Sequence, residues 1–274
     1  MCHHCVIETV KSRMLSRRDL FRGSAAVASV AAIAATAAPK PLFAQSAPMK
    51  AEDLTHELHE NFPSFDGEQQ VFIEPKYKLD PDGYNLNIWR LEEHIGTHID
   101  APLHFSADGR SVAELPVEDL VCPLAIIDIR AKAAESDDAQ VTPDDIAAWI
   151  SANGDLPEGV CVAMLSGWGE HVTTDKFRNA DEAGTMHFPG FHVEATNMLI
   201  EQSSAKAIAV DTMSLDFGQS PDFAVHYSWL PSGRYGIEGV ANLDRLPASG
   251  ATIIVGAPKM RGGTGGPARV FAVT

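Results

Sequence analysis

The chain has 274 residues, of which 45% are hydrophobic, and a formal net charge of −16 at pH 7. Residues 1–44 carry +4, so residues 45–274 carry −20. A body this acidic disfavours nucleic acid and anionic membranes as partners, while its length of about 230 residues is enough for one enzyme domain.

The first 44 residues have the layout of an export signal. Basic residues precede an apolar, Ala-rich stretch over residues 23–38, and Ala44 closes a cleavage zone. The pair Arg17 and Arg18 resembles a twin-arginine signal, whose pathway exports folded proteins. We therefore expect a periplasmic or secreted protein. An ordinary secretory leader or an uncleaved anchor are the alternatives. No later segment is apolar for long enough to cross a bilayer.

Four cysteines are present, and two of them lie in the predicted leader. Cys2 and Cys5 flank two histidines there, and we interpret this group as incidental. Cys122 and Cys161 lie in apolar, strand-like runs. Two buried free thiols are expected of such runs, although an exported protein could also join them as a disulfide. The sequence leaves both readings open.

Strand and helix patterns alternate along residues 45–274, which predicts one domain of the α/β or mixed α+β class. Thr142 caps a predicted helix that has Pro143 in its first turn and ends near Gly154. A second helix is predicted over residues 193–201. Strands are predicted at residues 71–73, within 85–99, and at 124–129, 159–165, 206–211, 252–256 and 270–273.

The segment of residues 94–104 concentrates metal-binding side chains. His94, His98, Asp100 and His104 all have the same parity, so an extended chain would present them on one face. Gly96 would share that face and leave room for an ion. A helix is the poorer interpretation, because Gly96 and a proline would lie inside it. We expect a bend at the proline.

Imidazole nitrogens and a carboxylate, without a thiolate, suit Zn, Mn, Fe or Co. The alternative is a loop with surface histidines. Three histidines and an acid on one face, with apolar residues at the intervening odd positions, favour a metal site.

The string H-x-G-T-H-x-D-x-P-x-H over residues 94–104 resembles the signature of the cyclase family, which includes bacterial kynurenine formamidases and isatin hydrolases. The segments at 188–195 and 209–216 are similar to two further motifs of that family, and the resemblance covers most of residues 45–274. It implies a β/β/α domain around a metal site, assembled as a homodimer or homotetramer, with N-terminal residues reaching a neighbouring subunit.

The resemblance also implies roles for individual residues. His104 would be the proton donor and acceptor. Asp100 would bridge two divalent ions, Zn or Mn, although some members hold a single Mn with a changed ligand set. The implied ligands are His94, His98 and Asp100 for the first ion, with Asp100, His226 and Glu238 for the second.

Several other side chains have weaker predicted roles. Thr97 is a candidate hydrogen-bond partner of a ligand. Trp168, His187 and His192 are candidates for the substrate pocket, although each could equally be structural. His192 departs from the small polar residue of many relatives, and the formamidases' tryptophan near the substrate is missing. Plain structural roles are expected for Asp211 and Asp216, and surface positions for His56, His59 and His171.

These features predict metal-assisted hydrolysis of a C–N bond in a small amide, a formamide or a cyclic amide. N-formylkynurenine is the substrate that a formamidase would take, and an isatin-hydrolase-like ring opening is the alternative. A lyase or cyclase that stabilises an enolate, and a metal-dependent binding protein, are readings from other classes. The proton shuttle that His104 offers favours an enzyme over a binding protein.

Overall fold

The computed structural model describes residues 49–274. The predicted export signal, residues 1–44, and its two cysteines lie outside the described residues. Residues 74–88 form a small compact unit, and residues 49–73 together with 89–274 form the main body. All residues of the predicted metal site belong to the main body.

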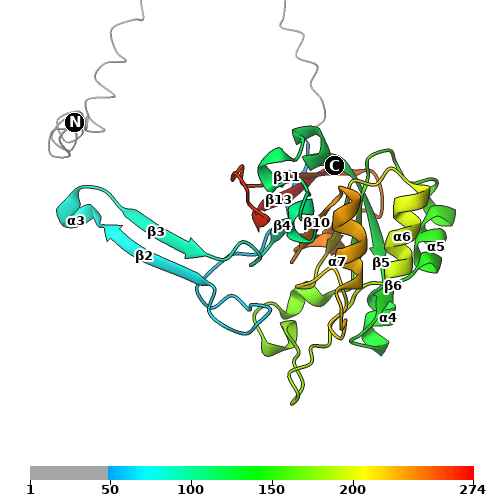
Figure 1. The fold of residues 1–274 in the computed structure, drawn as a ribbon, viewed down its shortest axis with the longest axis horizontal. Helices are drawn as coiled ribbons and strands as arrows, with labels where there is room; N and C mark the ends of the chain where they lie inside the picture. The colour runs from blue at the N-terminus through cyan, green and yellow to red at the C-terminus, as the bar shows by residue number, and fades with distance from the viewer. Residues whose placement is uncertain (1–48) are drawn as a thin grey trace, which may run out of the picture. The chain divides into compact units, whose positions relative to one another are not determined.

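A nine-stranded mixed sheet forms the centre of the main body (Figure 1). Its four middle strands are parallel, and antiparallel strands extend it on both sides. In spatial order the strands are β1 (Ala51–Asp53), β13 (Arg269–Val273), β11 (Ala251–Gly256), β5 (Val121–Asp128), β7 (Cys161–Leu165), β9 (Ala207–Val210), β10 (Tyr235–Glu238), β4 (His98–Asp100) and β12 (Gly265–Pro267).

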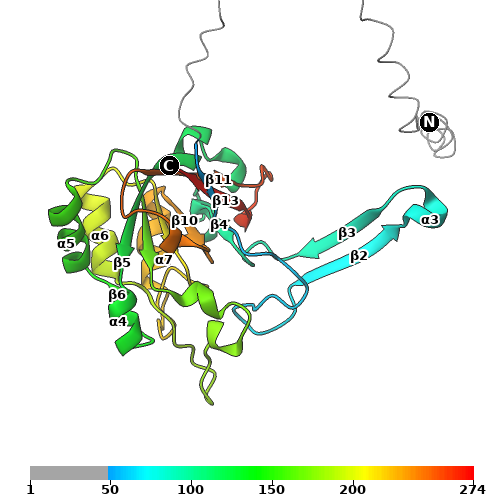
Figure 2. The ribbon, with the colours of Figure 1, turned by 180° about the vertical axis from the view of Figure 1, so that it is seen from behind.

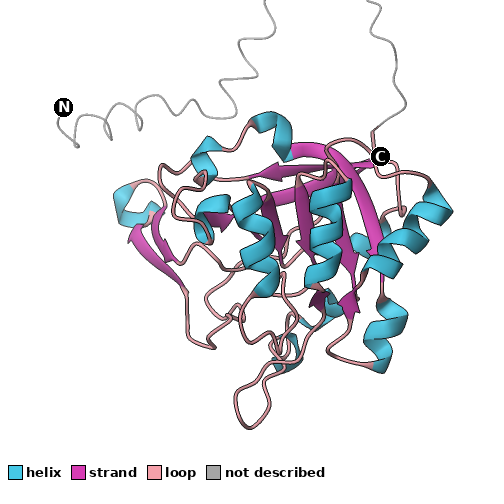
Figure 3. Ribbon diagram, turned by 45° about the vertical axis from the view of Figure 1, so that its right-hand side comes forward, coloured by secondary structure: helices cyan, strands magenta, loops and turns pink. Residues whose placement is uncertain are grey.

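Alternate residues of the sheet face two different cores, as the two-residue period of a strand requires. Ile127, Met164 and Val210 pack against the helices α5 (Pro143–Asn153), α6 (Val193–Gln202) and α7 (Ala224–Trp229), which lie together over the sheet in Figure 3. Their neighbours along the strands fill a second core, in which Ile99 of β4 and Val270 of β13 meet. Because these two strands lie near opposite ends of the sheet, the sheet must curl around this core (Figure 2).

The remaining elements are short. Strands β2 (Val71–Tyr77) and β3 (Leu86–Leu91) form a two-stranded sheet, and β6 (Gln140–Val141) and β8 (Gly190–Phe191) form another. The small unit of residues 74–88 contains α3 (Leu79–Asp82) and the rings of Tyr77 and Tyr84, whose centroids lie 5.1 Å apart with planes inclined by 48°. Helix α4 (Arg130–Glu135) follows β5. Among the described residues, no helix is long and apolar enough to span a membrane.

The predicted fold class, a mixed α+β fold, is confirmed. The helix expected after Thr142 is α5: the Thr142 hydroxyl and backbone amide both donate to Asp145 at 2.7 Å, which forms a capping box. Gly154 ends this helix with φ of 91°. The two cysteines of the described chain are buried free thiols in neighbouring strands, as the simpler reading expected.

The expectation of an extended chain over residues 94–104 is wrong. Only His98–Asp100 is a strand, and Gly96 turns the backbone before it with φ of 71°. A Cβ on Gly96 would lie 2.9 Å from Leu58, so this glycine serves the turn and does not leave room for an ion. Pro102 begins a 3₁₀ turn, Pro102–His104, which redirects His104. The side chains converge because the chain folds back.

Candidate metal centre

Two paired strands place the first three polar groups of the centre. His98 and Asp100 lie two residues apart on β4 and share a face, and Glu238 on β10 lies directly opposite His98. His98 Nε2 lies 3.3 Å from Asp100 Oδ1 and 3.3 Å from Glu238 Oε2. The His98 ring is held in this direction because its Nδ1 contacts the Gly96 carbonyl at 3.0 Å.

Helix α7 supplies a further imidazole, that of His226. His226 Nε2 lies 3.5 Å from Asp100 Oδ2 and 3.2 Å from Glu238 Oε1. Its other ring nitrogen lies 2.6 Å from Asp216 Oδ2, and Asp216 also accepts hydrogen bonds from the backbone amides of Val225 and His226. Asp216 thereby fixes both the start of α7 and the orientation of the His226 ring.

His94 and His104 complete the cluster from the turns on either side of β4. His94 Nδ1 lies 2.7 Å from Asp100 Oδ1, and its Nε2 lies 2.9 Å from the Thr264 hydroxyl. The His104 ring stacks on His94 with centroids 3.8 Å apart. Gly265 makes room for His94, because a Cβ there would lie 2.6 Å from its Cε1 atom.

These residues fit a divalent cation. Two overlapping groups could each hold an ion, His94–Asp100–His104 and His98–Asp100–Glu238, with Asp100 common to both. His98 Nε2 and Asp100 Oδ2 are buried and have no hydrogen-bond partner among the described residues, which is costly unless an ion binds them. The donors are imidazole and carboxylate groups, as Zn and Mn accept.

Burial and charge act against each other inside the centre. Burial opposes a charge on His98, but the carboxylates of Asp100 and Glu238 close to its ring raise its pKa to about 10 in the metal-free protein. The same balance, with Asp216 as a further partner, raises the pKa of His226 well above its usual value. Burial likewise opposes ionisation of Asp100, yet its three imidazole partners hold its pKa well below the usual range. The metal-free centre therefore holds protons where it could hold a cation.

His104 behaves differently from the other imidazoles. Burial lowers its pKa to about 4, and the nearby carboxylate of Asp100 only partly opposes this. The ring is therefore neutral at pH 7 and can accept a proton. It lies at the edge of the centre, with its ring centroid 4.7 Å from that of Phe105.

A cavity of about 280 Å³ opens onto the centre. His94, His104, His226 and Glu238 contribute to its wall. The rings of Phe65, Phe105 and Phe223 form an apolar side, while Gln70, Met213, Ser214 and the acids Asp66 and Glu92 complete the lining. A small molecule with a flat apolar part and a polar reactive group suits such a cavity.

Four predicted residues take other positions. Thr97 contacts no ligand side chain, since its hydroxyl donates to the Gly239 carbonyl at 2.5 Å and accepts from the His56 amide. Trp168 does not line the cavity: it is buried and donates through Nε1 to the Phe177 carbonyl. His187 and His192 are also absent from the lining. His187 pairs with Asp138 at 2.9 Å, and His192 caps α6 by accepting from the Glu194 amide.

The surface position expected for His56 is also wrong. Its Nε2 atom is buried, and its ring lies against Phe62 and Phe177. The plain structural role expected for Asp211 agrees with its contacts, because it accepts from the amides of Ser166 and Gly167. Asp216, expected to have such a role only, also orients His226.

Sequence analysis missed other groups that support the centre. Thr264 contacts His94, and Glu93 accepts from the amide and the hydroxyl of Thr264. Gly265 leaves space for His94 from the neighbouring strand β12. Thr264 lies 170 positions from His94, and neither Thr264 nor Gly265 forms a sequence pattern with it, whereas Glu93 is its direct neighbour in sequence. Only the strand pairing brings them together.

Comparison with known proteins places this geometry among related enzymes. Residues 52–217 match a family model described as "Putative cyclase". The chain is 32% identical over 216 residues to an isatin hydrolase of Roseibium aggregatum. The matched region covers 74% of this chain and 81% of that protein. It is 26% identical over 196 residues to a kynurenine formamidase of Salinibacter ruber, covering 69% of this chain and 80% of the relative.

Solved structures agree with these similarities. Isatin hydrolase A from Labrenzia aggregata, bound to benzyl benzoate, superimposes with a TM-score of 0.77 at 36% identity, over 82% of this chain and 94% of the other. An isatin hydrolase bound to the product analogue thioisatinate gives a TM-score of 0.76 at 31% identity, over 82% and 92% of the two chains.

Proposed function

The chain belongs to the cyclase family, and from this premise we propose that it is a metal-dependent hydrolase that cleaves a C–N bond in a small amide. The observation that carries the proposal is the buried donor cluster around Asp100, in which two polar atoms have no hydrogen-bond partner among the described residues. A neutral imidazole, His104, lies beside this cluster and faces the cavity.

The contacts within the cluster support a specific set of metal-binding residues. His98, Asp100 and Glu238 would hold one ion with His226 beside them, and His94 and Asp100 would hold a second or complete the first. The ion, Zn or Mn, when bound, would supply a Lewis acid that activates water and stabilises negative charge on the substrate oxygen. The two overlapping donor groups support a centre for two ions, and Asp100, which belongs to both groups, would contribute to holding each of them.

His104 performs the proton transfers. A water oxygen attacks the amide carbonyl carbon, and neutral His104 accepts the proton that this water loses. His104 then donates that proton to the leaving nitrogen as the C–N bond breaks. Its placement between the donor cluster and Phe105, at the cavity wall, leaves it within reach of a substrate held there.

Two amide classes follow from the relatives. Similarity to the isatin hydrolases supports a cyclic amide fused to an aromatic ring as the substrate. The three phenylalanines of the cavity are compatible with such a ring. Similarity to the kynurenine formamidase supports an aryl formamide, such as N-formylkynurenine, as the substrate. Both classes give the same bond cleavage and the same product type, an acid and an amine.

The test is hydrolysis of isatin and of N-formylkynurenine by the metal-loaded protein in ¹⁸O-labelled water. Incorporation of one labelled oxygen into the acid product of either substrate supports the proposal, because hydrolysis takes its oxygen from water. Turnover without label uptake would indicate a lyase or cyclase instead. Absence of turnover of both compounds would contradict the amide-hydrolase assignment.

We also propose that residues 1–44 direct export by the twin-arginine route and that the protein acts in the periplasm or outside the cell. The paired residues Arg17 and Arg18 before an apolar stretch support this. An Arg17→Lys, Arg18→Lys double variant should stay in the cytoplasm when cells are fractionated. Unchanged export of this variant would contradict the twin-arginine route.

A further inference from the structure

Two phenylalanines from separate segments border the cavity above the metal centre. Phe65 lies on the loop before β2 and Phe223 at the start of α7, and their ring centroids are 5.9 Å apart with planes inclined by 41°. Both line the same cavity as His94 and His104. A flat ring that enters this cavity therefore meets aromatic surface from two directions.

Phe223 is held in an unusual backbone conformation. Its φ of 52° lies in the left-handed region, which a bulky residue rarely adopts. The backbone strain persists because α7 is fixed directly after it: the Val225 amide donates to Asp216 at 2.9 Å. The Phe223 ring also lies 5.8 Å from Phe105 and 5.7 Å from His226, so its position is coupled to that of the metal centre.

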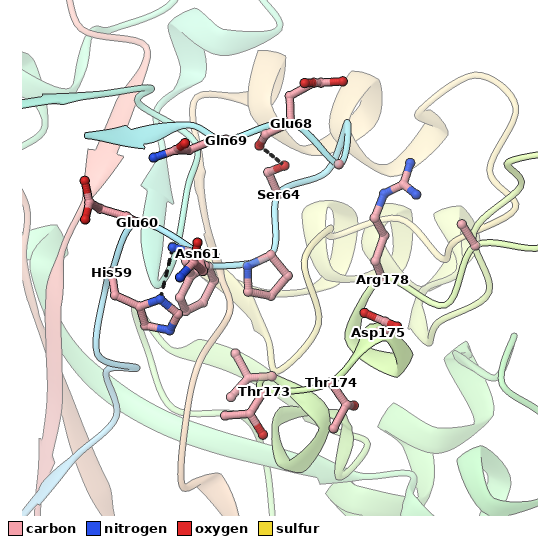
Figure 4. Close-up of a pocket in the computed structure, with 15 residues that line it drawn as sticks. His59, Glu60, Asn61, Ser64, Glu68, Gln69, Thr173, Thr174, Asp175 and Arg178 are labelled. Carbon is pink, nitrogen blue, oxygen red and sulfur yellow. Dashed lines mark hydrogen bonds between the residues drawn. The ribbon is translucent and has the colours of Figure 1, made fainter. Parts of the chain in front are cut away.

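The loop that carries Phe65 is a tight turn. The Ser64 hydroxyl donates to the Glu68 carbonyl at 2.6 Å, a bond drawn in Figure 4, and the Gly67 amide donates to the Ser64 carbonyl at 3.2 Å. Gly67, the last residue of this turn, has φ of 81°, a conformation that favours glycine. Phe65 is 37% exposed, so core packing alone does not fix its ring.

Arg178 joins this loop to a rigid part of the body. Its Nε donates to the Phe65 carbonyl at 3.0 Å, and a Cβ on Gly67 would lie only 3.4 Å from its guanidinium carbon. Arg178 lines a second cavity of about 700 Å³, and in Figure 4 its side chain extends toward the loop that carries Ser64 and Glu68. The glycine therefore lets the flat guanidinium lie against the turn.

The base of Arg178 is itself fixed. The preceding residue, Phe177, is 1% exposed, its carbonyl accepts from Trp168 Nε1 at 2.9 Å, and its ring meets that of Phe62 edge-on at 6.3 Å. A buried aromatic cluster thus anchors Arg178, and Arg178 in turn holds the backbone of Phe65.

We infer that Arg178 is a positioning residue for substrate selection: it places Phe65 so that Phe65 and Phe223 together grip the flat face of an aromatic amide above the metal centre. The inference rests on the proposed function in one respect: it takes the substrate to be an amide that is hydrolysed at the metal centre. Its ligand preference, however, can be measured without turnover.

The test compares two unreactive lactams, 2-indolinone, which carries a fused aromatic ring, and 2-pyrrolidinone, which lacks it. Calorimetry on the metal-loaded protein should show tighter binding of 2-indolinone, by about tenfold. Arg178→Met should weaken 2-indolinone binding about five- to tenfold and leave 2-pyrrolidinone binding and metal content unchanged. Arg178→Lys, which can still donate to the Phe65 carbonyl, should restore part of the loss.

Phe65→Leu and Phe223→Leu should reproduce the selective loss, and they test the inference even if Arg178→Met does not fold. Arg269→Met, at an exposed arginine on β13, is the matched control and should change nothing in this comparison. Equal affinity of the wild type for both lactams, or equal loss of both in the Arg178 and Phe65 variants, would overturn the inference. Selective binding in a protein that hydrolyses no amide would leave the inference standing and refute the proposed function.

Discussion

At the scale of single residues, the imidazoles around Asp100 differ in whether they carry a positive charge at neutral pH. The carboxylates close to His98 and His226 outweigh the cost of burying these rings and raise their pKa values, whereas burial dominates at His104 and lowers its pKa. The first two therefore suit cation binding, where a positive charge is stabilised. His104 suits proton transfer, because it stays unprotonated at neutral pH.

His104→Ala should reduce kcat by about 10²- to 10⁴-fold, the usual size of a general acid–base contribution, while metal content stays near that of the wild type. Steady-state kinetics and metal analysis of the same preparation check this. Because His104 also belongs to one donor group that could hold an ion, a parallel loss of metal would make it a ligand instead.

Metal uptake should release protons at pH 7. His98 has a pKa of about 10 and His226 a raised pKa in the metal-free protein, so both hold a proton at pH 7, whereas metal ligation requires the neutral imidazole. Affinity should therefore rise with pH up to about 10, the pKa of His98. Calorimetric titration of the chelator-treated protein in buffers of different ionisation enthalpy measures the release, and a value of zero would refute this protonation state.

At the scale of elements, the centre depends on strand pairing and on the start of one helix. The β4–β10 register sets Glu238 opposite His98, and Asp216 fixes the first turn of α7 together with the ring of His226. The ligands thus come from β4 and from two elements, α7 and β10, that follow it more than 120 residues later, and each element is fixed by its own hydrogen bonds.

Asp216→Asn tests the contribution of α7. The amide keeps the size of the carboxylate but removes the negative charge facing His226, so metal affinity should fall about 10- to 100-fold. Asp222→Asn, an exposed position just before α7, is the control and should retain wild-type affinity. Competition with a chromogenic chelator gives both affinities, and equal values for the two variants would show that Asp216 does not tune the ligand.

Sequence patterns predicted these elements unevenly. The capping pair Thr142 and Asp145 and the apolar strand runs are local signals, and the structure has a helix and strands there. The chain path around Gly96 was mispredicted, because residue parity cannot reveal a turn with positive φ. Thr264 and Arg178 could not be found at all, since their contacts depend on the tertiary arrangement of segments that share no sequence pattern.

At the scale of the whole molecule, β3 exposes large apolar side chains. Leu86 is 41%, Ile88 47% and Trp89 70% exposed. Leu86 and Ile88 share one face of the strand and Trp89 lies on the other. Apolar side chains this exposed favour burial against a partner, and we propose that the protein forms a homodimer or homotetramer through β3. All nine strands of the central sheet come from one chain, so the sheet itself is complete without a second subunit.

Trp89→Asp should therefore shift the protein toward the monomer, because a charge would replace a large apolar side chain in the contact. Light scattering coupled to size-exclusion chromatography measures the mass. Met260→Asp, another exposed apolar position of the body, is the control and should leave the mass unchanged. A monomeric wild type would contradict the proposed assembly.

The central claim is that Asp100 and its neighbours bind a catalytic divalent cation. Metal content by mass spectrometry, on protein lacking residues 1–44 and purified without chelator, tests it most directly, alongside the His94→Ala and Glu238→Ala variants. We predict about two ions per chain in the wild type and about one in Glu238→Ala, because each of the two donor groups could hold one ion and Glu238 belongs to only one of them. A wild type that holds no metal and takes up none on titration would contradict the account.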